Sequence, residues 1–251
     1  HIPYHIADQS QRQRQPLLVG LEHLLRLPQV RFSVTELLDL LDIPALRARF
    51  DLDETHLPQL REWIRGANIR WGLHAAQRAG MGLPAELEGT TWRFGLQRML
   101  LGFAAGGSGA WKGIEPQAAV GGLEAERVGA LHALMATLER YWQAMQQPRS
   151  AEDWATLISA LLDDVFRAES STEENLLLRL REALERWATE SELAGCAGEA
   201  LPIEVVSEAL LPSLDSPGLS QRFLAGAVNF ATLLPMRAIP FRQIWLLGMN
   251  D

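Results

Sequence analysis

Apolar residues recur at three- and four-residue spacing along most of the chain, which is the period of one face of an α-helix. The first such segment is Pro16–Leu27. A Ser-x-x-Glu capping box at Ser33 and Glu36 predicts where the second helix starts. Pro44–Phe50 begins with a proline and predicts a short third helix, because proline is favoured in the first turn.

The same pattern continues to about residue 211. The predicted helices are a segment capped by Asp53 and ended by Gly66, Trp92–Phe103 after the cap Thr91, Leu123–Met145, a segment capped by Ser150, a segment opened by the capping box Ser171 and Glu174, and Pro202–Leu211. Pro212 and Pro217 are expected to break the last helix. His74–Glu88 contains two glycines and a proline without a sustained period, so it predicts a loop.

The two ends of the chain have a different pattern. Ile2–Ile6 is a short apolar run that predicts a strand. Ala227–Leu234 and Gln243–Met249 are short runs rich in residues that favour strands, and Pro235 and Pro240 place a loop between them. The predicted fold is therefore mainly α, with a few short strands at the two ends.

Composition narrows the class of protein. The chain has 251 residues, of which 47% are hydrophobic and 22% charged, as in soluble globular proteins. No apolar run approaches the roughly 18 residues of a membrane span, and the first residues lack the features of a signal peptide. We therefore expect a cytoplasmic protein without a membrane partner. Cys196 is the single cysteine, which excludes an internal disulfide.

Charge is unevenly distributed along the chain. Its net value is −8, whereas residues 1–26 carry +1 and residues 221–251 carry +2, so the middle carries −11. Binding to nucleic acid requires clustered Lys and Arg. Any contact with DNA is therefore expected to be local and to lie near the two ends.

The last part of the chain resembles motif V of the superfamily 1 DNA helicases. That motif is a strand, then T-x-H-x-x-K-G-L-E-[FW], then a second strand. Its threonine falls on Thr232 and its lysine on Arg237, whereas Leu234 and Pro240 replace its histidine and glutamate. The positions that form the fold match, and the chemically active ones mostly do not.

Three stretches together resemble the RecC family, the gamma subunits of the bacterial RecBCD complex (exodeoxyribonuclease V). They are IPYHIADQS at the start, TWRFGLQRMLLGF in the middle and QRFLAG…LLPMRAIPF…LLGMND at the end. The resemblance implies a helicase-like region that keeps the motor fold without its ATPase residues. It implies that residues 1–27 and 221–251 are parts of a split RecA-like α/β domain, and that residues 28–220 are an inserted helical subdomain.

The resemblance also implies a function and partners. The RecBCD complex unwinds and degrades double-stranded DNA ends in recombinational repair. Its gamma subunit splits the duplex, guides the single strand through a channel and scans it for the Chi sequence. DNA and the RecB-like and RecD-like subunits would be the partners, and ATP and Mg²⁺ would bind to those subunits. This segment would belong to an ATP-dependent exonuclease without a catalytic site of its own.

Six residues are candidates for contact with DNA. A hydroxyl and arginine forks suit phosphate oxygens, and an aromatic ring beside an arginine can stack on a base. The candidates are Thr232, Arg237, Arg222, Arg242, Trp92 and Arg93. For each of these residues an ordinary structural role is also open, and tryptophan at helical spacing favours a place in the core.

Residues for other chemistry are missing from the sequence. Lys112 is the single lysine, and the surrounding GGSGAWKG lacks the second glycine and the hydroxyl of a phosphate-binding P-loop. The histidines lack metal-ligand spacing, and Cys196 has no nearby base. We therefore expect no cofactor, metal or nucleophile in this segment. Two alternatives remain: a fragment of an active ATP-dependent helicase, and a purely structural scaffold that contacts only protein.

Overall fold

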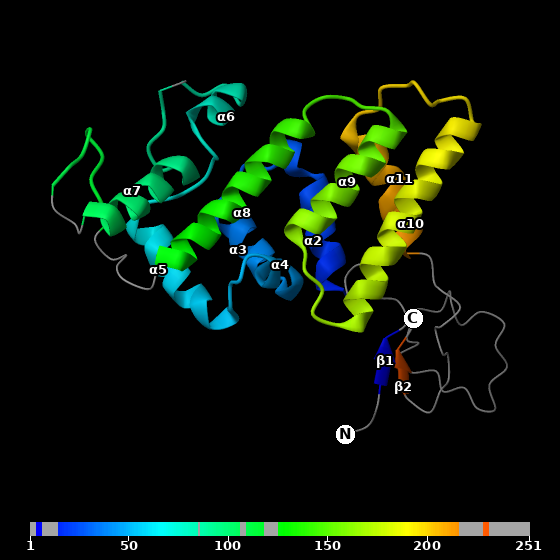
Figure 1. Ribbon diagram of the computed structural model, residues 1–251, viewed down its shortest axis with the longest axis horizontal. Helices are drawn as coiled ribbons and strands as arrows, with labels where there is room; N and C mark the ends of the chain where they lie inside the picture. The colour runs from blue at the N-terminus through cyan, green and yellow to red at the C-terminus, as the bar shows by residue number, and fades with distance from the viewer. Residues whose placement is uncertain are drawn as a thin grey trace, which may run out of the picture.

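The computed structural model describes residues 4–6, 15–84, 86–105, 109–117, 125–215 and 228–230. In these residues helices dominate, and the strands are short (Figure 1). In chain order the elements are β1 (Tyr4–Ile6), α2 (Pro16–Leu25), the 3₁₀ turn η1 (Leu27–Gln29), α3 (Val34–Leu41), α4 (Pro44–Arg49), the 3₁₀ turn η2 (Glu54–His56), α5 (Leu57–Gly66), α6 (Ala75–Gly80), α7 (Trp92–Ala105), α8 (Ala125–Ala144), α9 (Ala151–Val165), α10 (Ser171–Leu193), α11 (Ile203–Asp215) and β2 (Val228–Phe230).

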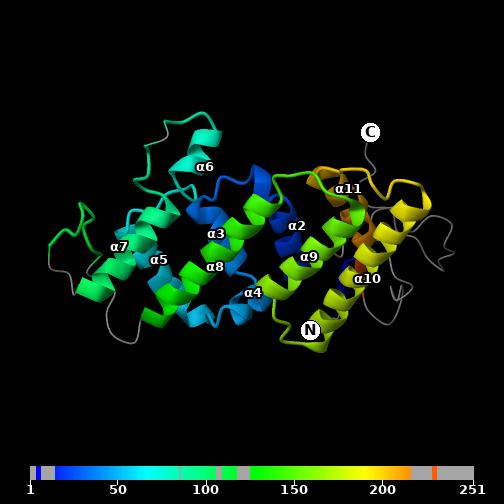
Figure 2. The ribbon, with the colours of Figure 1, turned by 45° about the horizontal axis from the view of Figure 1, so that its top comes forward.

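The helices form one elongated unit. Helices α5, α6 and α7 lie at one end and α10 and α11 at the other, with α8 and α9 between them (Figures 1 and 2). Helix α10 packs along α9, and α2 contacts both α4 and α11. A continuous core of buried apolar side chains connects these elements. The mainly helical fold class predicted from the sequence is confirmed.

Several predicted helix starts are confirmed in atomic detail. The Ser33 hydroxyl accepts a hydrogen bond from the Glu36 amide at 3.2 Å, and the Glu36 carboxylate accepts one from the Ser33 amide at 2.6 Å. The Thr91 hydroxyl accepts from the Phe94 amide at 3.2 Å, and the Ser150 hydroxyl accepts from Asp153 at 3.1 Å. These caps satisfy amides that the first turn of a helix leaves without partners.

The long helices are held together by apolar faces and a few polar contacts between them. The face of α8 that the sequence predicts is buried at Val128, Leu131, Leu134, Met135, Leu138 and Tyr141. The Tyr141 hydroxyl donates to Asp164 on α9 at 2.7 Å. The indole of Trp154, which is fully buried, donates to the Leu201 carbonyl at 2.7 Å and so fixes the chain that enters α11.

Two glycines let α7 approach its neighbours closely. A Cβ at Gly95 would overlap the side chain of Ile69, and one at Gly102 would overlap the backbone of Gln117. They lie seven residues apart, which is about two helical turns, so both are on one face of α7. This face is packed without room for a methyl group.

Four local predictions need correction: the loop at residues 75–80, the starts of α5 and α10, and the end of α11. Residues 75–80 form α6 where a loop was expected, because the His74 side chain caps the Gln77 amide at 3.1 Å. Asp53 precedes the turn η2, so α5 begins later, at Leu57. The cap of α10 is Ser170 instead of Ser171.

The capping geometry explains the shift at α10. The Ser170 hydroxyl accepts from the Glu173 amide at 3.3 Å, and the Glu173 carboxylate accepts from the Glu169 amide at 2.8 Å. Both the serine and the glutamate therefore act one residue earlier than the sequence pattern suggests. Helix α11 also continues past Pro212 to Asp215, since one missing donor in the last turn does not end a helix.

The two ends of the chain meet in a parallel strand pair. Strand β1 pairs with β2 in the register Tyr4 to Val228 and Ile6 to Phe230. The strands lie side by side below the helical unit in Figure 1. The third predicted strand, Gln243–Met249, lies outside the described residues. The RecA-like character of the ends and the division at residues 27 and 221 stay predictions.

Candidate functional site

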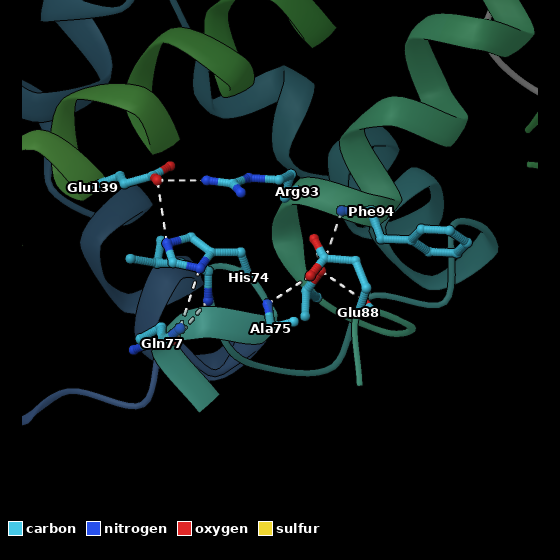
Figure 3. A network of polar contacts seen from close by, with 9 residues as sticks. His74, Ala75, Gln77, Glu88, Arg93, Phe94 and Glu139 are labelled. Carbon is cyan, nitrogen blue, oxygen red and sulfur yellow. Dashed lines mark hydrogen bonds and ion pairs between the residues drawn. The ribbon is translucent and has the colours of Figure 1, made fainter. Parts of the chain in front are cut away.

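The candidate DNA-binding residues fall into two groups. Thr232, Arg237, Arg222 and Arg242 lie outside the described residues, on either side of β2 in the sequence. Trp92 and Arg93 lie in the first turn of α7, and Arg93 takes part in a network of polar side chains (Figure 3). This network connects α6, α7 and α8.

Trp92 and Arg93 have different surroundings. Trp92 is 1% exposed, and its indole N–H donates to the Phe32 carbonyl at 2.8 Å. The ring is thus part of the core, the structural role that the sequence analysis favoured for tryptophan. The side chain of Arg93 is 47% exposed and donates to the Glu139 carboxylate on α8 at 2.7 Å.

His74 is at the centre of the network. Its Nδ1 accepts from the Gln77 amide, so the neutral ring carries its proton on Nε2. Nε2 lies 3.2 Å from the same Glu139 oxygen that Arg93 binds, although its alignment falls short of a hydrogen bond (Figure 3). Nδ1 is therefore used in the cap of α6, whereas Nε2 lies close to a carboxylate without a hydrogen bond to it.

Burial and charge set the protonation of His74. Burial lowers the pKa of His74 below its ordinary value, and the positive charge of Arg93 lowers it further. The carboxylates of Glu139 and Glu88 oppose this effect only in part. The imidazole is thus neutral at physiological pH.

Glu88 ties the start of α6 to the start of α7. Its carboxylate accepts from the Ala75 amide at 2.6 Å, and its carbonyl accepts from the Thr91 hydroxyl at 2.7 Å (Figure 3). The segment between the two helices is held at both ends as a result.

Arg78 holds the same segment from inside. It is 4% exposed, and it donates to the carbonyls of Leu87 at 3.0 Å and Gly89 at 2.9 Å. It also donates to the Trp71 carbonyl and to the Thr90 hydroxyl, and its guanidinium lies 4.4 Å from the centre of the Trp71 ring. Burial lowers the pKa of Arg78, yet an arginine remains a cation in proteins.

This arrangement has the properties of a structural network. His74, Arg78 and Glu88 are all bound to backbone groups, and the Arg93 guanidinium is the exposed cation at its edge. In the described ranges, no three His, Cys, Asp or Glu side chains are placed so that they could hold a metal ion. Of the helices that the structure describes, none combines the length and hydropathy needed to cross a membrane.

Comparison with known proteins decides the family. The family model described as "RecBCD enzyme subunit RecC fourth domain" matches residues 14–218. The chain is 40% identical over its whole length to the RecBCD enzyme subunit RecC of Escherichia coli K12, and 34% identical over its whole length to that of Haemophilus influenzae. The chain belongs to the RecC family. A RecC subunit of Mycolicibacterium smegmatis is 29% identical over 98% of the chain.

The RecC match covers a limited part of the relatives. The chain spans 22% of the length of the Escherichia coli and Haemophilus influenzae proteins. The fourth-domain match contains all the described helices and ends before the segment that resembles motif V.

Sequence reasoning missed the residues that organise the polar network of this RecC domain. His74 and Arg78 were placed in a predicted loop, and Glu139 in α8 carried no motif. Their partners are mostly backbone groups, which leave no trace in the order of side chains. The sequence signal for the network was Arg78 close to Gly80 and Gly82, and an arginine near glycines is too common to predict a buried role.

Proposed function

We propose that this RecC-family segment binds DNA without hydrolysing a nucleotide. It would do so as part of a RecBCD-type complex in the bacterial cytoplasm that acts in recombination and in repair of double-strand breaks. Its contribution is to guide DNA, through duplex splitting, passage of the single strand and scanning for Chi. RecB-like and RecD-like subunits are its protein partners. ATP and Mg²⁺ belong to those partners in this proposal.

The observation that carries the proposal is the parallel pairing of β1 with β2. It joins the two ends of the chain, which are the parts with a positive net charge. Parallel neighbours need a long connection between them, and the helical unit is that connection here. In the sequence, Arg222 precedes β2 and Thr232, Arg237 and Arg242 follow it, so all four candidates are neighbours of this strand along the chain.

The sequence supports a role without catalysis. Leu234 and Pro240 occupy the places of the histidine and glutamate of motif V, and in the motor proteins this motif couples contact with DNA to the nucleotide site. Arginine suits a phosphate because its planar fork can donate two parallel hydrogen bonds. Arg237 is therefore assigned to a phosphate of the single strand.

The test is the binding of a fluorescein-labelled single-stranded oligonucleotide, measured by fluorescence anisotropy at low and moderate salt. The chain is compared with Arg237→Ala, and circular dichroism verifies that both are folded. We expect salt-sensitive binding that the substitution weakens. If the folded chain does not bind even at low salt, the proposal is wrong.

A scaffold role is the second candidate, and the surface of α10 favours it. Leu178 and Leu193 on this helix are 53% and 83% exposed, next to several exposed glutamates. Such a surface fits a contact with another subunit. Stable co-purification with a RecB-type subunit that is lost on Leu178→Glu, with DNA binding absent, would favour the scaffold role.

A further inference from the structure

Arginines line a groove between α3 and α5, remote from the candidate residues near β2 in the sequence. The groove has a volume of about 320 Å³. Its floor is apolar and its edges carry hydroxyls and three arginines; the lining residues that matter are Ser33, Thr35, Arg61, Arg65 and Arg70. Among the described residues that line it, none is acidic.

The three arginines are exposed and largely free of carboxylates. Arg61 lies 3.9 Å from Asp42, and this exposed pair is weak. Within the described residues, the guanidinium groups of Arg65 and Arg70 have neither a carboxylate within 4 Å nor a hydrogen-bonded acceptor. Arg61 and Arg65 are four residues apart and therefore lie on one face of α5.

Backbone hydrogen bonds hold Arg70 beside the start of α3. The Val34 amide at the start of α3 donates to the Arg70 carbonyl at 3.0 Å, and the Arg70 amide donates to the Thr90 carbonyl at 2.9 Å. The nearby carboxylate of Glu36 is used by the cap of α3. Among the described residues, the exposed Arg61–Asp42 pair is thus the one contact within 4 Å between these arginines and a carboxylate.

The larger groove between α4 and α8 differs in charge. It has a volume of about 780 Å³, and its lining contains Arg49 and Arg127 together with Asp51, Glu126 and Asp164. Mixed charge of this kind does not attract a polyanion. In a chain with a net charge of −8, a groove whose described charged residues are all arginines is a local concentration of positive charge that can attract an anion.

We propose that the groove of Arg61, Arg65 and Arg70 binds the phosphodiester backbone of single-stranded DNA. This inference rests on the proposed function and adds a second contact, in the helical unit, to the one near β2. Arginine and hydroxyl groups are the usual donors to phosphate, and the apolar floor suits the sugars. The part of the lining that the structure describes contains no aromatic residue on which a base could stack, so the contact is independent of base sequence.

The experiment compares two double variants with the same change in charge. Arg65→Gln/Arg70→Gln removes the two unpaired arginines of the groove. Arg179→Gln/Arg186→Gln removes two exposed arginines of α10, at the opposite end of the helical unit (Figures 1 and 2). Binding of fluorescein-labelled oligothymidylate and oligodeoxyadenylate is measured by anisotropy over a range of salt concentrations, after circular dichroism has shown that each variant is folded.

The groove variant is expected to bind both oligonucleotides on the order of ten-fold more weakly than the unsubstituted chain. The slope of the logarithm of its binding constant against the logarithm of salt concentration should be shallower by about 1.4, because each of two lost phosphate contacts contributes about 0.7. The α10 variant should bind as the chain does. If the groove variant loses no more than the α10 variant, the groove assignment is wrong while the proposed function stands. Binding of polyglutamate but not of either oligonucleotide would assign the groove to an acidic protein segment and overturn it.

Discussion

Removal of Arg78 tests whether the polar network holds the α5–α7 end of the protein together. The guanidinium donates to four acceptors, the carbonyls of Trp71, Leu87 and Gly89 and the hydroxyl of Thr90. Each hydrogen bond from a charged donor is worth roughly 1.5–3 kcal/mol. Arg78→Ala removes all of these contacts and leaves several backbone carbonyls in a poorly hydrated place.

The net loss is smaller than the sum of the four bonds. A buried cation carries a desolvation cost of several kcal/mol, and one of its own donors, Nε, is buried without an acceptor. The substitution relieves both costs. We therefore expect Arg78→Ala to lower the free energy of unfolding by about 2–4 kcal/mol, a large part of the stability of a typical domain. Arg78→Lys should restore little, because one ammonium group cannot reproduce the planar fork.

The assay is urea unfolding followed by far-UV circular dichroism. Arg186→Ala is the control, since Arg186 is an exposed arginine on α10 that should change stability by less than about 0.5 kcal/mol. If Arg78→Ala and Arg186→Ala unfold at the same urea concentration, the guanidinium does not organise this region and the reasoning is refuted.

Three further changes test other features. Gly95→Ala should destabilise the chain by about 1–3 kcal/mol in urea unfolding, because the new methyl group would overlap Ile69. Gly129→Ala, with open space around it on α8, should stabilise the chain by about 0.5–1 kcal/mol. Equal effects of the two changes would contradict the close packing of α7. Because the pKa of His74 is lowered in the folded chain, the unfolded chain binds a proton first as the pH drops, and stability should fall below pH 6.5. His74→Asn, which keeps a helix cap, should weaken this fall in unfolding midpoints measured above and below pH 6.5. An unchanged pH dependence would show that His74 is not responsible. Ser170→Ala should lower the free energy of unfolding by about 1 kcal/mol in thermal unfolding, and Ser171→Ala should lower it much less. The reverse order would show that Ser171 is the cap, as the sequence pattern suggested.

Local chemistry made most of the helices predictable. The capping box at Ser33 and the caps at Thr91 and Ser150 depend on residues three positions apart, so the sequence contains the whole interaction. The buried face of α9 could be predicted for the same reason, because its apolar period is a property of neighbouring residues. At α10 the sequence pattern predicted Ser171 as the cap, whereas the contacts of Glu173 with Ser170 and Glu169 place the start one residue earlier.

The polar network could not be predicted, because its contacts join distant parts of the chain. Arg93 binds Glu139 from a different helix, and the Trp92 indole donates to Phe32, 60 residues away in the sequence. Arg65 belongs to no motif, and the role proposed for Arg65 and Arg70 depends on a groove without described acidic residues that exists only in the folded protein. The net charge along the sequence predicted contact with DNA at the two ends alone. The arginines of the groove lie in the acidic middle, where the many carboxylates outweigh them in a sum of charges.

The most direct test of a DNA-guiding segment is the affinity of the chain for single-stranded DNA as a function of salt, measured by anisotropy with and without ATP and Mg²⁺. The account predicts that the logarithm of the binding constant falls linearly with the logarithm of salt concentration, and that ATP leaves it unchanged. A folded chain that does not bind at low salt, or whose affinity changes when ATP is added, would contradict it.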